Sequence, residues 1–134
     1  MKKNMIIAMA VLILQAVAVT AQTQRQTIYT PDQVDQRAMF PGGQDGMLSF
    51  MMQHMKYPKE AEKEKAQGTV VVHFVVEPDG SISDAHVPDS QKVHPVLDAA
   101  AVQLVKKMPK WKPAKLKGKN VRQSASHAVA FRYN

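Results

Sequence analysis

The sequence predicts an α+β fold, with a small antiparallel three-stranded sheet and helices packed on one face. Two features predict the sheet: a valine-rich run at residues 68–78 that ends at Asp79-Gly80, and an alternating run at residues 121–133. Residues 96–108 carry apolar side chains at helical spacing and separate the second strand from the third. Two further helical segments precede the first strand, so the predicted order is helix, helix, strand, strand, helix, strand.

The first residues have the pattern of a secretory signal peptide. Lys2 and Lys3 precede an apolar run at residues 5–21, which ends in small residues before a polar segment. We therefore expect a signal peptide over residues 1–21 and export of the rest of the chain. The alternative is an uncleaved membrane anchor, because the run is close to the minimum length for crossing a bilayer. Removal of the two lysines lowers the formal net charge from +7 to +5.

Residues 22–39 are rich in glutamine and predict a polar tether, whereas residues 40–134 predict the folded domain. After Phe40, apolar residues recur at spacings that fit a helix with a broad apolar face. These residues are Met47, Leu48, Phe50, Met51, Met52 and Met55. We interpret the methionines as core residues rather than metal ligands. The chain has no cysteine, so this exported domain depends on its hydrophobic core for stability.

A second, short helix is predicted at residues 58–66. Pro58 suits the first turn of a helix, and Tyr57-Pro58 therefore separates this helix from the methionine-rich one. Lysine and glutamate side chains lie three and four residues apart around Ala61, which is typical of a solvent-exposed helix face. Gly68 is the expected cap at its end.

The dipeptide Asp79-Gly80 predicts a two-residue hairpin turn, because both central positions of the favoured turn require positive φ. Counting back from this turn gives the register of the two strands. The core face pairs Val76 with Ser83, Phe74 with Ala85 and Val72 with Val87. The mixed, solvent-exposed face pairs Glu77 with Ile82, Val75 with Asp84 and His73 with His86.

Trp111, the only tryptophan, lies in a lysine-rich stretch at residues 108–121. The alternation of Lys110, Trp111 and Lys112 predicts that the indole faces the core and that the lysines face water. We disfavour a nucleic-acid site, because one inward-facing aromatic ring provides no stacking platform. The alternative is that the lysines steer the domain toward an acidic protein, a lipid headgroup or a cell-wall polymer. In the last strand, the alternation places Val129, Phe131 and Tyr133 on one face.

The sequence predicts a protein that is not an enzyme and has no cofactor. It lacks a cysteine nucleophile, a GxSxG turn, an HExxH helix and a phosphate-binding loop. His73 and His86 face each other across the predicted hairpin and are weak candidates for a metal site. We expect no metal function from them, because the sequence indicates no third convergent ligand.

Several short motifs follow one another along the chain. They are Tyr57-Pro58 with Ala61, Gly68, Asp79-Gly80, Leu97-Asp98 with Ala100-Ala101, the segment 108–113, Gly118-Lys119 and Phe131. In this order and at these separations they resemble the TonB C-terminal domain, over about residues 40–133. The helix that follows Phe40-Pro41-Gly42-Gly43 is similar to the form in TonB-like energy transducers of Bacteroidetes-type bacteria. Only residues 22–39 stand where a transducer has a long linker, so the chain resembles a short, free-standing form.

The resemblance implies a periplasmic module that binds outer-membrane TonB-dependent receptors. In the family, an inner-membrane complex supplies the force, and a receptor segment called the TonB box pairs with the last strand by β-augmentation. The matching strand here is at residues 121–133. By the same resemblance, Tyr57 and Pro58 frame the binding groove. The expected partner-binding residues are Tyr57, Pro58, Val121, Arg122, Gln123, Ser124, Ala125, Ser126, His127 and Ala128.

A second hypothesis uses the same strand edge for a structural role. The edge is long, and Ser124 and Ser126 stand where an unused edge carries proline or an inward charge. It is therefore also suited to pairing with a second copy of the chain, as a homodimer, or to docking onto a larger envelope protein. If the N-terminal run is not cleaved, the domain is anchored to the inner membrane and faces the periplasm. The third hypothesis is a basic protein that binds an anion or the cell wall.

Overall fold

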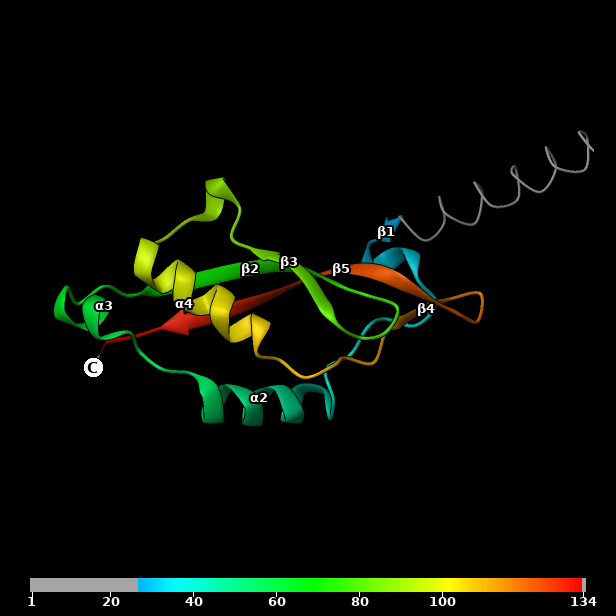
Figure 1. Cartoon of the computed structure of the whole chain (residues 1–134), viewed down its shortest axis with the longest axis horizontal. Coiled ribbons are helices and arrows are strands. Elements are labelled where there is room, and N and C mark those ends of the chain that lie inside the picture. The colour runs from blue at the N-terminus through cyan, green and yellow to red at the C-terminus, as the bar shows by residue number, and fades with distance from the viewer. Residues whose placement is uncertain (1–26, 134) are drawn as a thin grey trace, which may run out of the picture.

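The long strand β5 (Lys119–Phe131) runs along the domain and pairs with three of the other described strands (Figure 1). The computed structural model describes residues 27–133, so the predicted signal peptide lies outside the described residues. The remaining strands and α-helices are β1 (Ile28–Tyr29), α2 (Gly43–His54), α3 (Lys59–Lys63), β2 (Gly68–Val76), β3 (Ile82–His86), α4 (Pro95–Lys106) and β4 (Ala114–Leu116). Two short 3-10 helices span Pro31–Gln33 and Asp89–Gln91. Within the described residues, no helix is long and apolar enough to cross a membrane.

The sheet has the strand order β1-β5-β2-β3, and β4 also pairs with β5. β2 and β5 form the longest ladder, which is antiparallel and runs from Gly68 opposite Phe131 to Val76 opposite Gln123. The predicted α+β class is confirmed, but the sheet has five strands rather than three. The two additional strands, β1 and β4, have only two and three residues, which is too short for a side-chain period to reveal them.

The β2–β3 connection differs from the predicted two-residue turn. The N–H of Glu77 donates to the carbonyl of Ser81, and the N–H of Gly80 donates to the carbonyl of Glu77, both at 2.8 Å. The loop therefore comprises residues 78–80. Pro78 suits the first position of such a turn, and Gly80 adopts a left-handed φ of 89°.

The longer loop shifts the register of the hairpin by one residue. Val76 pairs with Ile82 and Val75 with Ser83, so their predicted pairings with Ser83 and Asp84 are wrong. The ladder has an irregularity after this point, and Asp84 has a positive φ of 54°. This bulge restores the predicted pairing of His73 with His86.

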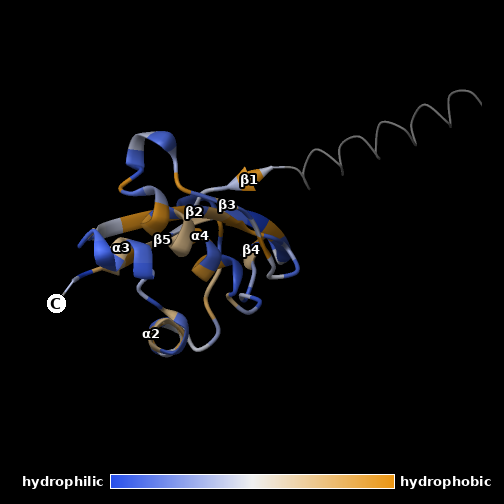
Figure 2. Cartoon of the chain, turned by 60° about the vertical axis from the view of Figure 1, so that its left-hand side comes forward, coloured by the Kyte–Doolittle hydropathy of each residue, from blue (hydrophilic) through white to orange (hydrophobic). Residues whose placement is uncertain are grey.

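The core lies between α4 and the sheet. Helix α4 buries Leu97, Ala101, Leu104 and Val105, as its helical spacing predicts. The sheet contributes the predicted alternation of β2 and the end of β5, and Figure 2 shows hydrophobic residues concentrated along these strands. The buried sheet residues include Val70, Val72, Phe74, Val76, Val129 and Phe131. Tyr133, predicted to share the face of Phe131, lies beyond the strand and is exposed, because β5 ends at Phe131.

Trp111 packs against this core, in agreement with its predicted inward orientation. Its ring meets Phe40 and Phe74 edge to face, with centroid separations of 5.7 and 5.4 Å. The indole is partly buried, whereas Lys110 and Lys112 are exposed. The lysine-rich stretch is therefore the solvent-exposed rim of a core aromatic cluster.

Residues 28–39 run along the domain, although they were expected to be a tether. After β1, the main chain of Gln36 pairs with Lys115, and that of Met39 pairs with Lys112. The N–H of Ala38 donates to the side-chain oxygen of buried Gln123 at 2.8 Å. These contacts involve mainly the main chain, which the glutamine-rich composition of the segment does not indicate.

Candidate strand-binding site

The outer edge of β5 directs main-chain groups away from β2 at every second residue. Glu77 directs its N–H and C=O toward the β3 side of the hairpin. Because these directions alternate along a strand, Val76, Phe74 and Val72 direct theirs toward β5. The residues that pair with them, Gln123, Ala125 and His127, direct their main-chain groups back toward β2. The residues in between, which direct their main-chain groups to the outer edge, are Ser124, Ser126, Ala128 and Ala130.

Part of this edge is already paired within the chain. β1 runs parallel to β5 and covers it at Arg122 and Gln123. The hydroxyl of Ser124 donates to the carbonyl of Tyr29 at 3.4 Å. No other described strand pairs with this edge at residues 125–131. Three successive outward-facing residues, Ser126, Ala128 and Ala130, therefore offer one main-chain donor and one acceptor each.

An apolar groove with a volume of about 680 Å³ lies between α2 and this open edge. Phe50 is the buried residue of α2, and its ring packs against Phe40 at a centroid separation of 5.6 Å. The groove contains the flexible side chains that suit an adaptable binding surface. It is lined by Ala38, Met39, Phe40, Gly43, Gln44, Met47, Leu48, Met51, Met55, Trp111, His127, Ala128 and Ala130.

Two polar atoms in the residues that line the groove lack hydrogen-bond partners. Nε1 of Trp111 and Nε2 of His127 are buried, and neither has a partner among the described residues. Burial lowers the pKa of His127 below its ordinary value of 6.5, so its imidazole is neutral at pH 7. A buried donor or acceptor without a partner costs roughly 1–3 kcal/mol. Two residues that line the groove therefore carry hydrogen-bonding capacity that the described part of the fold does not use.

The structure divides the predicted partner-binding residues of β5 into two groups. Val121, Arg122 and Gln123 are used by the fold itself. Val121 pairs with β4, Gln123 binds Ala38, and the guanidinium Nε of Arg122 lies 2.6 Å from a carboxylate oxygen of Glu77. The second group, residues 124–128, lies on the part of the strand whose outer edge is open beyond Ser124.

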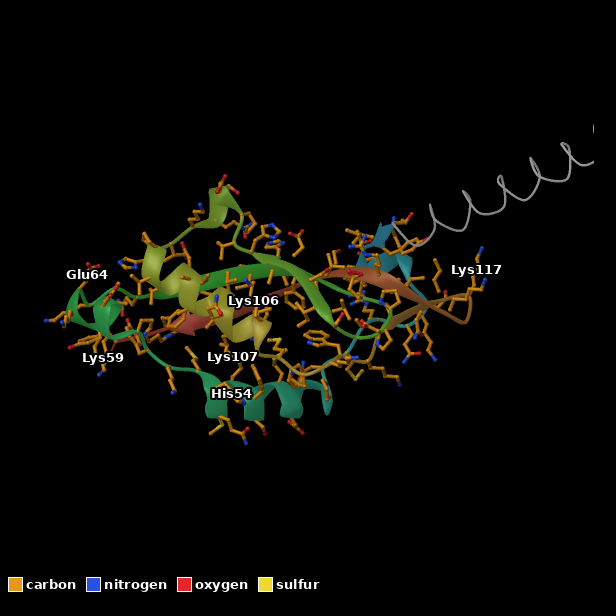
Figure 3. All side chains as sticks on the ribbon, viewed as in Figure 1. His54, Lys59, Glu64, Lys106, Lys107 and Lys117 are labelled. Carbon is orange, nitrogen blue, oxygen red and sulfur yellow. The ribbon has the colours of Figure 1, made fainter. Side chains whose placement is uncertain are left out.

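Tyr57 and Pro58 lie apart from the apolar groove. The hydroxyl of Tyr57 donates to the carbonyl of Ala66, and its ring packs edge-on against Phe131 at 5.9 Å. Pro58 lines a second hollow of about 220 Å³ at the end of α4, together with Lys107 and His54. Figure 3 shows Lys107 and His54 at the facing ends of α4 and α2. The two predicted framing residues thus flank the C-terminal end of β5.

His73 and His86 have hydrogen-bond partners other than a metal. Their ring centroids are 6.3 Å apart across the hairpin. Nε2 of His73 lies 3.1 Å from the side-chain oxygen of Gln91, and Nδ1 of His86 lies 2.7 Å from the carbonyl of Asp84. The described part of the chain contains no group of three or more His, Cys, Asp or Glu residues arranged to hold a metal ion.

Sequence reasoning missed the groove because it assigned the methionine-rich helix to the core. Met47, Met51 and Met55 do pack against the core as partly buried residues. Leu48 and Met52, however, are 61% and 79% exposed. Helix α2 buries only Phe50, so its other apolar side chains remain available to contact a partner. The sequence indicates this surplus, because the apolar face of the helix is broader than packing against the core requires.

An open strand edge beside an apolar groove is the arrangement found in modules that bind extended segments by adding a strand. The family described as "Gram-negative bacterial TonB protein C-terminal" matches residues 53–134. The chain therefore belongs to the TonB C-terminal domain family, which confirms the resemblance noted from its motifs. Domains of this family are non-enzymatic binding or transducer modules, and membership associates the chain with TonB-type transport in the bacterial envelope.

Among solved structures, two solution NMR structures of the Helicobacter pylori TonB C-terminal domain are similar to this chain. They share 22% and 23% sequence identity with it, and both comparisons cover 66% of its length. The comparisons cover 78% and 92% of the two solved chains, with TM-scores of 0.43 and 0.44. No curated protein matches the chain.

Proposed function

We propose that this domain acts in the periplasm and binds an extended segment of an outer-membrane TonB-dependent receptor by β-augmentation. The bound segment, a TonB box, pairs with the outer edge of β5 at residues 124–131. The observation that supports this proposal is the row of unpaired main-chain groups at Ser126, Ala128 and Ala130. Through this contact the domain takes part in energised transport across the outer membrane, with an inner-membrane complex as the source of force.

The shape of the edge determines how such a segment binds. A strand advances about 3.3 Å per residue, so five to six residues cover the open edge over roughly 17–20 Å. Its side chains alternate between the two faces of the sheet. Those on the face of His127 enter the apolar groove beside α2. The main chain therefore supplies affinity that depends little on sequence, and the groove supplies selection at alternate positions.

The basic charge of the chain plays a secondary role in this proposal. The formal net charge, which is +7 for the full chain and +5 without residues 1–21, favours encounter with an acidic receptor surface, and salt weakens this effect. The lysines are spread over the molecule rather than gathered at the groove. Figure 3 shows Lys117 at the β4–β5 hairpin, distant from Lys59 at the start of α3. We therefore assign the lysines to steering and the edge of β5 to recognition.

An NMR titration of residues 22–134 with peptides from the periplasmic ends of TonB-dependent receptors tests the proposal. We expect chemical-shift changes at residues 124–131 and along the groove-facing side of α2. The variant Ala128→Pro removes one outward main-chain donor and should weaken binding at least tenfold. Ala128→Ser keeps the donor and is the matched control. Equal binding by both variants, or shifts confined to other elements, would place the site elsewhere.

A second copy of the chain is the other candidate occupant of this edge. The edge lacks the proline or inward charge that discourages edge-to-edge pairing. Analytical ultracentrifugation over a hundredfold range of concentration distinguishes the two. A monomer that binds receptor peptides supports the transport role. A dimer that persists on dilution, is broken by Ala128→Pro and ignores the peptides would support self-association instead.

A further inference from the structure

We infer that His127 and Trp111 make the groove beside β5 selective for an uncharged carboxamide side chain, that of glutamine or asparagine, on the strand that binds the edge. This inference rests on the proposed function and concerns the chemistry of its partner. It follows from three observations: two residues of the lining have buried nitrogen atoms without partners among the described residues, the lining carries no permanent charge, and His127 lies between the outward-facing residues of β5.

The two nitrogen atoms belong to residues that pack against other parts of the fold. His127 stands opposite Val72 in the β2–β5 ladder. The indole of Trp111 is fixed between the rings of Phe40 and Phe74. Both residues line the same groove, and their buried nitrogen atoms have no partners among the described residues. Polar groups whose side chains are already held by packing are well suited to select a ligand, because less ordering is needed when it binds.

The electrostatic character of the lining excludes a charged occupant. No lysine, arginine, aspartate or glutamate lines the groove, and burial keeps the imidazole of His127 neutral by lowering its pKa. A charged side chain would lose its hydration there and gain no ion pair. A purely apolar side chain would fit the methionine walls but leave both nitrogen atoms without partners. A neutral side chain that forms hydrogen bonds satisfies both conditions.

Among neutral side chains, a carboxamide matches the two nitrogen atoms best. The indole N–H is only a donor, and the carboxamide oxygen accepts from it. Nε2 of a neutral imidazole is an acceptor in one tautomer and a donor in the other. The carboxamide carries both an NH₂ donor and an oxygen acceptor, so it can pair with either tautomer. A hydroxyl group has one oxygen for both nitrogen atoms, which is a more restrictive geometry.

The main chain determines which residue of the bound strand enters the groove. Ser126 and Ala128 direct their N–H and C=O groups outward, and His127 lies between them. The strand residue whose side chain lies on the face of His127 therefore reaches the groove. Access requires movement of methionine side chains at the rim, and these are the most adaptable side chains in the lining.

Trp111 provides a direct test, because it is the only tryptophan in the chain. We would measure binding of three receptor-derived peptides that differ only at the groove position, with glutamine, leucine or glutamate. The glutamine peptide should bind about five- to tenfold tighter than the leucine peptide and more than tenfold tighter than the glutamate peptide. The indole N–H resonance should move downfield with glutamine and stay nearly unchanged with leucine.

Single substitutions test whether His127 and Trp111 cause the preference for the glutamine peptide. His127→Phe should reduce the glutamine preference to less than twofold. His86→Phe, on the distant β3, is the matched control and should keep the full preference. Circular dichroism and melting of each variant establish that it is folded. If His127→Phe does not fold, Trp111→Phe tests the same point, since it removes the indole donor and keeps an aromatic ring.

The outcomes separate this inference from the proposed function. If all peptides shift the resonances of β5 and bind with equal affinity, the edge is the site and the carboxamide preference is wrong. If the leucine peptide binds tightest, the groove is a purely apolar pocket, and the inference is again overturned. If no peptide binds at millimolar concentration, the proposed function fails and the inference fails with it.

Discussion

Truncation of Trp111 is the most informative test of the fold near the site. The indole packs edge to face against Phe40 and Phe74, and the next residue, Lys112, pairs with Met39 through its main chain. Complete removal of a buried tryptophan costs about 3–5 kcal/mol. Trp111 is only partly buried, but its two edge-to-face contacts each add about 0.5–1.5 kcal/mol beyond the buried area. We therefore expect Trp111→Ala to destabilise the domain by about 3–4 kcal/mol.

The same structure predicts a much smaller effect for Trp111→Phe. A phenyl ring retains most contacts with Phe40 and Phe74 and removes the buried N–H that has no partner. The lost contact area and the removed penalty act in opposite directions, so we expect a change below about 1.5 kcal/mol. Urea denaturation followed by far-ultraviolet circular dichroism measures both variants. A cost below about 1 kcal/mol for Trp111→Ala would show that the aromatic cluster does not hold this region together.

Three further predictions concern single residues near the site. Gly80→Ala should destabilise the domain by at least about 2 kcal/mol in urea denaturation, because a Cβ would lie 2.1 Å from the carbonyl oxygen of Trp111 at a φ of 89°. Gln123→Ala should cost roughly 1–3 kcal/mol and speed amide hydrogen exchange at Ala38, whose N–H loses its acceptor. Because burial lowers the pKa of His127 in the folded state, the unfolded chain binds more protons as pH falls through about 6.5. Its contribution to stability should therefore be intact above that pH and decline below it, and His127→Phe should flatten this slope between pH 7.5 and 5.5.

Side-chain periodicity predicted the elements that pack against the core. Helix α4 and strand β2 bury their apolar residues at the spacing that the sequence shows, because each element has one face in the core over its whole length. Strand β1 has two residues and pairs through its main chain, so its side chains show no period. The hairpin register was wrong near its turn because Pro78 adds a loop residue that the Asp79-Gly80 signal does not reveal.

The candidate site was only partly predictable for a related reason. Strand β5 and its last-strand position were visible in the sequence, and the open edge was expected along it. Which part of the edge is free depends on the packing of residues 28–39 against it, and that packing rests on main-chain contacts between distant segments. The groove likewise depends on how far α2 stands from the sheet, which no pattern within the helix encodes.

The parallel pairing of β1 with β5 has a mechanical consequence. β1 and the open edge lie in line along the same side of β5, and because β1 runs parallel to β5, Ile28 lies nearer the β4–β5 hairpin than Tyr29 does. A pull on Ile28 toward that hairpin runs along the strand axis and acts on β1 in shear. Because β1 has only two residues, we expect it to yield before the pairing of Gln36 and Met39 with Lys115 and Lys112. Its release would expose the outer main chain of Arg122, so we expect tension to lengthen the surface that is available to hold a bound strand.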